Sequence, residues 1–304
     1  MDLVERLSRG EGDFLLFGIT PPKASASPTD LQRIAESTLG RLRSLGPDGV
    51  VLYDILEEQD RNPETRPFPF LPTLDPADYL ADYLTGWDKS AVVYRAVGKY
   101  PETDLAEWLQ RQPTNRIATV LVGASSSRHR GQTSLARAHE LRHQLQPNLI
   151  TGAVAIPERH TARGDEHIRM LAKQTAGCSF FVSQVLYDAD AAKNLVSDYR
   201  DECDARGILP RPIAFTLSVC GSLKTLQFLT WLGVQVPRWM QRDLERTDDT
   251  LAASLEHSRA AGLDVLHYCR RLNVPAGLNI ESVSTRRVEI DAAMQLAAEL
   301  RAVL

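Results

Sequence analysis

Eight short apolar runs alternate with amphipathic segments along most of the chain, and this alternation constrains the fold more than any other feature. The runs are continuously apolar, which is typical of parallel strands that are buried on both faces. We predict strands at 14–19, 49–53, 91–97, 117–122, 149–156, 179–184, 212–217 and 276–281.

Helical patterns fill the intervals between these runs. We predict helices at 28–45, 76–86, 103–111, 132–145, 165–176, 188–206, 221–232, 248–272 and 285–303. An additional segment, VPRWMQRDL, is inserted between the seventh strand and the long helix that follows it. Strict alternation of strand and helix predicts an α/β fold, a single (β/α)8 TIM barrel domain over residues 1–304.

A doubly wound sheet is the alternative fold. Such a sheet usually carries a glycine-rich phosphate loop in its first strand-to-helix turn. The corresponding turn here reads GITPPK, which lacks that pattern. The barrel is therefore favoured.

Composition excludes several classes of function. The formal net charge of −4 argues against a nucleic-acid-binding protein, and no apolar run approaches the roughly 20 residues of a membrane span. The first residues are polar and show no secretion signal. The four cysteines are scattered singly, which predicts reduced thiols in a cytoplasmic protein and no metal site. A monomer and a homo-oligomer are both compatible with the sequence.

Side chains at the carboxyl ends of barrel strands are the natural candidates for chemistry, because active sites of TIM barrels form there. Tyr53 and Asp54 end the second predicted strand, and Tyr94 lies at the end of the third. Gln184 ends the sixth strand and Glu281 ends the eighth. The loop at 61–76 carries five prolines, and we interpret it as a structural flap, with a mobile lid as the alternative.

Four motifs, in the right order along the chain, resemble the methylenetetrahydrofolate reductase family. They read FGITPPK at 17–23, GAVAIPERH at 152–160, KQTAGCSFFVSQVLYD at 173–188 and VPRWM at 236–240. The resemblance extends over most of the chain, from roughly residue 13 to residue 300. The resemblance implies NAD(P)H-dependent reduction of 5,10-methylenetetrahydrofolate in one-carbon metabolism and methionine biosynthesis, with a reduced folate as the small-molecule partner.

The resemblance also implies roles for individual residues. It assigns folate binding to Gln184, whose amide can pair with a pterin edge, and to Tyr187 in the same motif. Cofactor binding falls to the residues at family cofactor positions, which are Tyr53, Tyr94, Ala124, His160 and Lys173.

The chain departs from the family pattern where the family holds its catalytic acid and its flavin. Gly18 occupies the position of the family's catalytic glutamate on the first strand. Ala124, Ile156 and Ala172 replace an aspartate, a tyrosine and an arginine that contact flavin in the family. Charge-assisted contacts contribute on the order of 1–3 kcal/mol each, so we expect no tightly bound FAD and direct hydride transfer from NAD(P)H.

A replacement acid is then needed. We predict that Glu281 supplies it, because the eighth strand lies next to the first in a barrel; Asp54 and Glu57 are second candidates. Two alternatives stay open: an FAD-dependent reductase with a rearranged site, and a non-catalytic folate-binding homologue.

Overall fold

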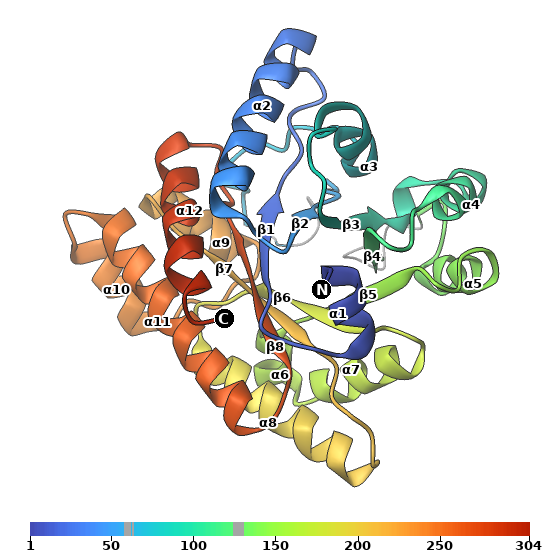
Figure 1. Cartoon of the computed structure of the whole chain (residues 1–304). Coiled ribbons are helices and arrows are strands. Elements are labelled where there is room, and N and C mark those ends of the chain that lie inside the picture. The colour runs from blue at the N-terminus through green and yellow to red at the C-terminus, as the bar shows by residue number, and fades with distance from the viewer. Residues whose placement is uncertain (58–61, 63, 124–130) are drawn as a thin grey trace.

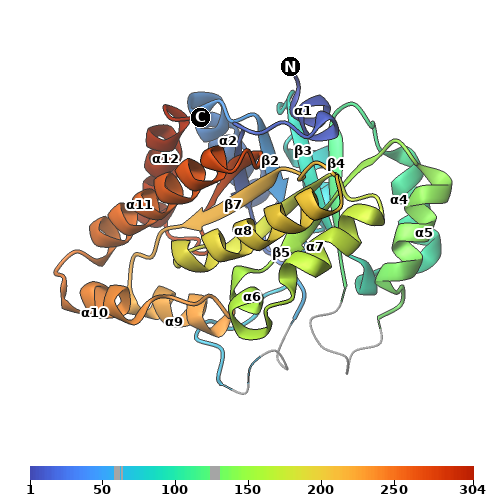
Figure 2. The same cartoon turned by 90° about the horizontal axis from the view of Figure 1, so that it is seen from below.

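The computed structural model is a closed barrel of eight parallel strands that follow one another in chain order, with helices around the outside (Figures 1 and 2). The structure describes residues 1–57, 62, 64–123 and 131–304. The predicted TIM barrel is confirmed, and each strand lies within one residue of its predicted ends. The strands are β1 (Leu15–Ile19), β2 (Gly49–Leu52), β3 (Ser90–Ala96), β4 (Ile117–Val122), β5 (Ile150–Ala155), β6 (Phe180–Val185), β7 (Ile213–Ser218) and β8 (Ala276–Glu281).

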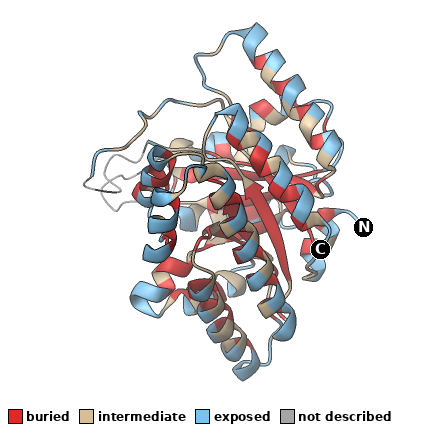
Figure 3. Ribbon diagram, turned by 90° about the vertical axis from the view of Figure 1, so that its left-hand side faces the viewer, coloured by how far each residue is buried: buried red, intermediate tan, exposed pale blue. Residues whose placement is uncertain are grey.

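Helices cover the barrel and carry their exposed faces outward (Figure 3). They are α1 (Leu3–Arg9), α2 (Pro28–Leu45), α3 (Pro76–Asp78), α4 (Glu102–Arg111), α5 (Leu135–Leu145), α6 (Pro157–Arg163), α7 (Glu166–Thr175), α8 (Ala189–Ala205), α9 (Leu223–Trp231), α10 (Arg238–Arg246), α11 (Thr250–Arg271) and α12 (Arg287–Arg301). A π-helix (Tyr79–Tyr83) extends α3, and a 3-10 turn (Val97–Lys99) follows β3. None of the helices in the described part of the chain is long and apolar enough to cross a membrane.

Local sequence explains where these helices begin and end. In α2, the Ser27 side chain accepts a hydrogen bond from the Asp30 amide, and Pro28 occupies the first turn. Both features satisfy or remove the unpaired amides at a helix start. The helix ends at Gly46, which adopts the left-handed conformation that glycine tolerates best.

The two larger apolar cores lie on opposite sides of the barrel wall, because successive strand residues point to opposite sides. Leu16, Val51 and Val92 belong to the core inside the barrel. Their neighbours Leu15 and Val50 belong to the larger core between the strands and the surrounding helices. Every residue of β2, β3 and β7 is buried, which explains the continuous apolar runs in the sequence.

The helix α1 was not predicted, because the polar N-terminal residues carry only three apolar side chains. Leu3, Val4 and Leu7 are all buried and join the core inside the barrel. Figure 2 shows α1 at one end of the barrel and α6, α9 and α10 at the opposite end. The first helix therefore closes the end away from the strand carboxyl termini.

The described part of the proline-rich loop is fastened to α9. The indole nitrogen of Trp231 donates a hydrogen bond of 2.9 Å to the Glu64 carbonyl, and the Arg66 guanidinium lies 5.1 Å from the centre of the Trp231 ring. An isolated antiparallel bridge joins Thr73 to Lys23 in the loop after β1. These contacts agree with a structural flap that spans the strand ends.

Candidate functional site

The carboxyl ends of β8, β1, β2 and β3 bring four inward-facing positions together. In register, Gly18 pairs with Glu281 on one side and with Val51 on the other, so the three strands are adjacent at this height. The rings of Tyr53 and Tyr94 meet edge to face, with their centres 5.0 Å apart. The structure therefore brings together three predicted site residues: Glu281, Tyr53 and Tyr94.

The side chain of Glu281 occupies the space that a side chain at Gly18 would need. A β-carbon at Gly18 would lie 2.9 Å from the Glu281 β-carbon, 3.1 Å from its Oε2 atom and 3.0 Å from the Tyr53 ring. Real β-carbons essentially never lie within 3.0 Å of such an atom, so the contact with the Glu281 β-carbon excludes a side chain at position 18. Glycine at position 18 is thus the condition for placing the carboxyl of Glu281 at this point of the barrel.

The carboxyl of Glu281 is set up to hold a proton near neutral pH. Burial raises its pKa to about 7, and a hydrogen bond from the Tyr53 hydroxyl opposes that rise in part. The residue as a whole is half-buried, but its Oε2 atom is enclosed and has no hydrogen-bond partner. A carboxylic acid with this pKa is suited to general acid catalysis.

A directional hydrogen-bond chain fixes the Tyr53 hydroxyl. The amide nitrogen of Asn279 donates to Tyr53 Oη at 2.7 Å and to Thr216 Oγ1 at 3.1 Å, while the Thr216 hydroxyl donates to the Ser183 carbonyl at 2.8 Å. Because Tyr53 Oη accepts from Asn279, its own proton is free to point at Glu281. Burial, and next the charge of Glu281, raise the pKa of Tyr53 well above its usual value, so the hydroxyl stays protonated.

Asn279 was not singled out from the sequence. The signal is present, since Asn279 lies two residues before Glu281 on a strand, and residues two apart share one face. The carbonyl oxygen of its amide is buried and has no hydrogen-bond partner, so it is an additional acceptor at this end of the barrel.

Gln184 lies at an irregularity in the sheet. The pairing of β6 with β7 shifts register between Val182 and Val185, and bulges of this kind re-aim side chains next to active sites. The Gln184 amide nitrogen donates to the Leu232 carbonyl at a long 3.3 Å, and its oxygen accepts from the Val185 amide at 3.1 Å. The long contact of the amide nitrogen leaves this half-buried group available for exchange with a ligand.

Tyr187 is placed differently. Its side chain is only 2 % exposed, and it packs in the apolar cluster beneath α9 and α10. Its hydroxyl donates to the Ser218 carbonyl at 2.8 Å. This burial argues against a direct contact between Tyr187 and folate.

Asp54 belongs to a buried charged network on the helix side of the barrel wall. Its Oδ2 atom accepts hydrogen bonds from the Ala96 amide at 2.8 Å and from the Tyr100 hydroxyl at 2.7 Å, and its Oδ1 atom pairs with Lys99. The Tyr100 hydroxyl also lies 2.8 Å from Asp75. Both oxygens of Asp54 are therefore engaged by donors within this network, apart from Glu281, Tyr53 and Tyr94.

His160 and Lys173 point into the helix layer. The Lys173 ammonium donates to the Val154 carbonyl at 2.6 Å and lies 3.5 Å from Glu166, while His160 Nε2 lies 3.0 Å from Asp198 on α8. Neither side chain joins Tyr53, Tyr94 and Glu281. Ala124, the remaining predicted cofactor residue, lies outside the described residues.

Glu158 is a second acid that was not selected from the sequence. It is 8 % exposed, and burial raises its pKa to about 7. Its Oε1 atom accepts a hydrogen bond of 3.4 Å from the Gln235 amide, and its Oε2 atom has no partner. Only its position after β5 marked it in the sequence.

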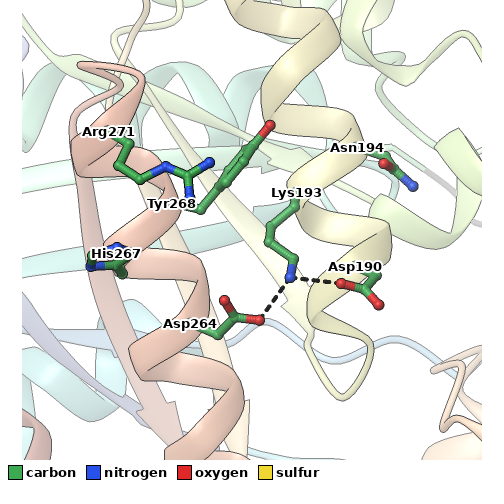
Figure 4. A pocket seen from close by; sticks show the side chains of 7 residues that line it. All are labelled: Asp190, Lys193, Asn194, Asp264, His267, Tyr268 and Arg271. Carbon is green, nitrogen blue, oxygen red and sulfur yellow. Dashed lines mark hydrogen bonds and ion pairs between the residues drawn. The ribbon is translucent and has the colours of Figure 1, made fainter.

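A separate hollow lies on the outer surface between α8 and α11 (Figure 4). An ion pair crosses it, because the Lys193 ammonium lies 2.6 Å from Asp190 and 2.8 Å from Asp264. This charged, open surface lies on the helix exteriors and shares no residue with the group around Glu281.

Comparison with known proteins supports the sequence resemblance. A family model described as methylenetetrahydrofolate reductase matches residues 127–271. An uncharacterized protein from Clostridium thermocellum that binds two copies of 5-methyl-5,6,7,8-tetrahydrofolic acid is 35 % identical, with 99 % of each chain covered and a TM-score of 0.88. No curated protein matches the chain.

More distant structures share the barrel alone. A xylanase of glycoside hydrolase family 10 from Thermobacillus composti is 14 % identical, with a TM-score of 0.52 over 98 % of this chain and 99 % of that chain. An endoxylanase from a sugarcane soil metagenome is 9 % identical, with a TM-score of 0.53 over the same shares. The full-length similarity to the Clostridium protein and the family match agree, and the chain belongs to the methylenetetrahydrofolate reductase family.

Proposed function

We propose that this protein reduces 5,10-methylenetetrahydrofolate to 5-methyltetrahydrofolate with hydride from NAD(P)H, and that Glu281 is its general acid. The observation that carries the proposal is the carboxyl of Glu281 in the space beside Gly18. The family's acid stands on the first strand, at the position of Gly18. A carboxyl from the neighbouring strand can reach the same point without any change of fold.

The proton comes from Glu281. When one carbon–nitrogen bond of the methylene bridge breaks, its electron pair goes to the departing nitrogen, which takes the proton of the neutral carboxyl. The remaining nitrogen and the bridge carbon form an iminium cation, which accepts two electrons as hydride from the dihydronicotinamide ring. The products are the methylated folate and the oxidised nicotinamide, and solvent returns a proton to Glu281. General acid catalysis contributes roughly 10²–10⁴-fold to rate.

The other groups at the strand ends orient the pterin and the acid. We assign Gln184 to the pterin edge, because its amide nitrogen makes only a long contact within the protein and the residue lies at a bulge. Tyr53 steadies the Glu281 carboxyl, and Tyr94 offers a ring face beside it.

The described residues do not fit a tightly bound flavin. Two side chains at family flavin positions are held by other partners: His160 by Asp198 on α8, and Lys173 by the Val154 carbonyl on β5. Ile156 offers no aromatic face where the family stacks a tyrosine on the flavin. We therefore propose direct hydride transfer from NAD(P)H. A stoichiometric flavin absorbance in the purified protein, or activity that requires added FAD, would instead favour the FAD-dependent alternative.

The decisive experiment is an anaerobic assay of NADH and NADPH oxidation with methylenetetrahydrofolate, with and without FAD. We expect turnover by the unmodified protein and a loss of about 10²–10⁴-fold in kcat for Glu281→Gln. The matched control is Glu107→Gln, whose side chain is 64 % exposed on α4. Turnover by Glu281→Gln at the unmodified rate would sink the assignment of the acid.

A non-catalytic folate-binding protein is the second candidate. It is favoured by one observation, that the similar Clostridium protein binds two copies of the methylated folate. This candidate predicts saturable binding of 5-methyltetrahydrofolate, measured by calorimetry, with no oxidation of NADH or NADPH in the assay above. Binding together with turnover would exclude it.

A further inference from the structure

Three helices bring two imidazoles and a carboxylate together, away from the group around Glu281. His160 lies on α6, His167 on α7 and Asp198 on α8, and each offers a ligand atom within 4.8 Å of the other two. His160 Nε2 lies 3.0 Å from Asp198 Oδ2, and the two imidazole rings meet edge to face with their centres 5.1 Å apart. Across the described ranges, no other group of three His, Cys, Asp or Glu side chains converges in this way.

The burial of these side chains points to a ligand. The His160 side chain is only 6 % exposed, yet its Nδ1 atom has no hydrogen-bond partner, and the same holds for the buried Nδ1 atom of His167. A neutral imidazole has one nitrogen donor and one nitrogen acceptor, and burying an unpaired polar atom costs on the order of 1–3 kcal/mol. An ion that binds His160 Nε2, the nitrogen that faces Asp198, leaves His160 Nδ1 unchanged, so the buried unpaired atom that an ion can satisfy is Nδ1 of the neighbouring His167.

We propose that His160, His167 and Asp198 bind a divalent transition metal ion of the zinc class. Two imidazole nitrogens and one carboxylate oxygen suit such ions, whereas calcium and magnesium prefer oxygen ligands alone. Ligand bonds of about 2.0–2.2 Å in a tetrahedron separate the ligand atoms by roughly 3.3 Å. His160 and Asp198 already lie near that separation, and the ligand atom of the half-buried His167 lies within 4.8 Å of both.

The consequence of this site is a cross-link in the helix layer. Asp198 is 51 % exposed, so the fourth position of the ion opens to solvent. The ion would tie α6 to α7 and α8, and α6 is the short helix after β5 that also carries Glu158. The proposal is independent of the proposed reduction, because none of the three ligands lies among Glu281, Tyr53 and Tyr94.

The experiment titrates untagged, chelator-treated protein with Zn²⁺ by calorimetry and with Co²⁺ by visible absorption. We expect one equivalent of metal per chain, a higher melting temperature in the presence of Zn²⁺, and affinity at least about tenfold weaker in His167→Ala and in Asp198→Ala. Neither variant removes a fully buried side chain, so both should fold.

The matched control is His257→Ala. His257 Nε2 lies 2.8 Å from Asp243 Oδ2, a similar histidine–carboxylate pair that lacks a third ligand, and this change should leave metal affinity unaltered. Three results would overturn the proposal: no saturable binding by the unmodified protein, equal affinity in His167→Ala, or a cobalt spectrum with thiolate bands from the buried cysteines.

Discussion

At the scale of single residues, the candidate site depends on two residues that are paired on neighbouring strands, one without a side chain and one with a carboxyl. Gly18 on β1 has no side chain, and Glu281 on β8 places its carboxyl in the space that this absence leaves. Because the two residues are paired in register, a carboxyl can leave one strand and return on the next without moving the reaction centre. Under the proposed function, the acid would keep its place in space although its position in the sequence differs from that of the family.

This exchange predicts that the acid can be moved back. Glu281→Gly should lose about 10²–10⁴-fold in kcat, and Gly18→Glu alone should be impaired because its β-carbon meets the Glu281 β-carbon at 2.9 Å. The double variant Gly18→Glu/Glu281→Gly removes that β-carbon and restores a carboxyl, so its kcat should exceed that of Glu281→Gly at least tenfold. Steady-state kinetics of the three variants tests this directly.

The same double variant can also contradict the argument. If it turns over no faster than Glu281→Gly while its circular dichroism and melting temperature match those of the parent, the carboxyl position is not interchangeable and the argument from Gly18 fails.

Tyr53 should control the protonation of Glu281. Its hydroxyl lowers the pKa of the carboxyl, so Tyr53→Phe should raise that pKa further above about 7. The alkaline limb of the pH–rate profile should then move to higher pH, because the neutral acid persists longer. A ¹³C titration of the labelled glutamate carboxyls measures the same shift without turnover. Tyr268→Phe on the outside of α11 is the control, and identical profiles for all three proteins would contradict the role of Tyr53.

At the scale of elements, α1 closes the end of the barrel that lies away from the strand carboxyl termini. Leu7 is fully buried against the core inside the barrel. Replacing it with alanine should cost about 2–5 kcal/mol in the free energy of unfolding, measured by urea denaturation, because the cavity cannot collapse between strands. Leu209→Ala is the control, since this leucine is 82 % exposed and its loss should cost under about 0.5 kcal/mol. Equal effects would mean that α1 packs only loosely.

The same elements show what the sequence could and could not predict. Strands and long helices followed from periodicity, because buried parallel strands are apolar throughout and surface helices repeat every 3.6 residues. The short helices α1 and α6 did not, because seven residues give too few apolar positions to reveal a helical period. Among the candidate site residues, Glu281 was selected in the sequence by its place at a strand end. The direction in which His160 points was not, because it depends on a partner thirty-eight residues away on α8.

At the scale of the whole molecule, the barrel separates two kinds of polar group. Inside, at the strand ends, Glu281, Tyr53 and Asn279 form a small set with an unpartnered acid oxygen and an unpartnered amide oxygen. Outside the wall, Arg95 binds Asp75 at 2.8 Å. Burial raises the pKa of Asp75, but the Arg95 charge and hydrogen bonds from the Tyr100 hydroxyl and two backbone amides together outweigh it and lower that pKa. Pairs of this kind stabilise the helix layer, while an unpartnered acid oxygen and an unpartnered amide oxygen lie together at the strand ends.

Two buried acids should make the stability of the fold depend on pH. Burial raises the pKa values of Glu158 and Glu281 from 4.5 to about 7. Between about pH 4.5 and 7 the folded protein therefore binds more protons than the unfolded chain, so stability from these groups is complete at low pH and is lost as pH rises through 7.

The double variant Glu158→Gln/Glu281→Gln mimics the neutral acids and should remove this loss. Urea denaturation at pH 5, 6, 7 and 8 should show the unmodified protein losing on the order of 5 kcal/mol relative to the double variant across that range, about half from each carboxyl. Glu107→Gln should run parallel to the unmodified protein. If the double variant also runs parallel to it, the two carboxyls are ionised in the folded state, and Glu281 could not serve as the neutral acid of the proposed reaction.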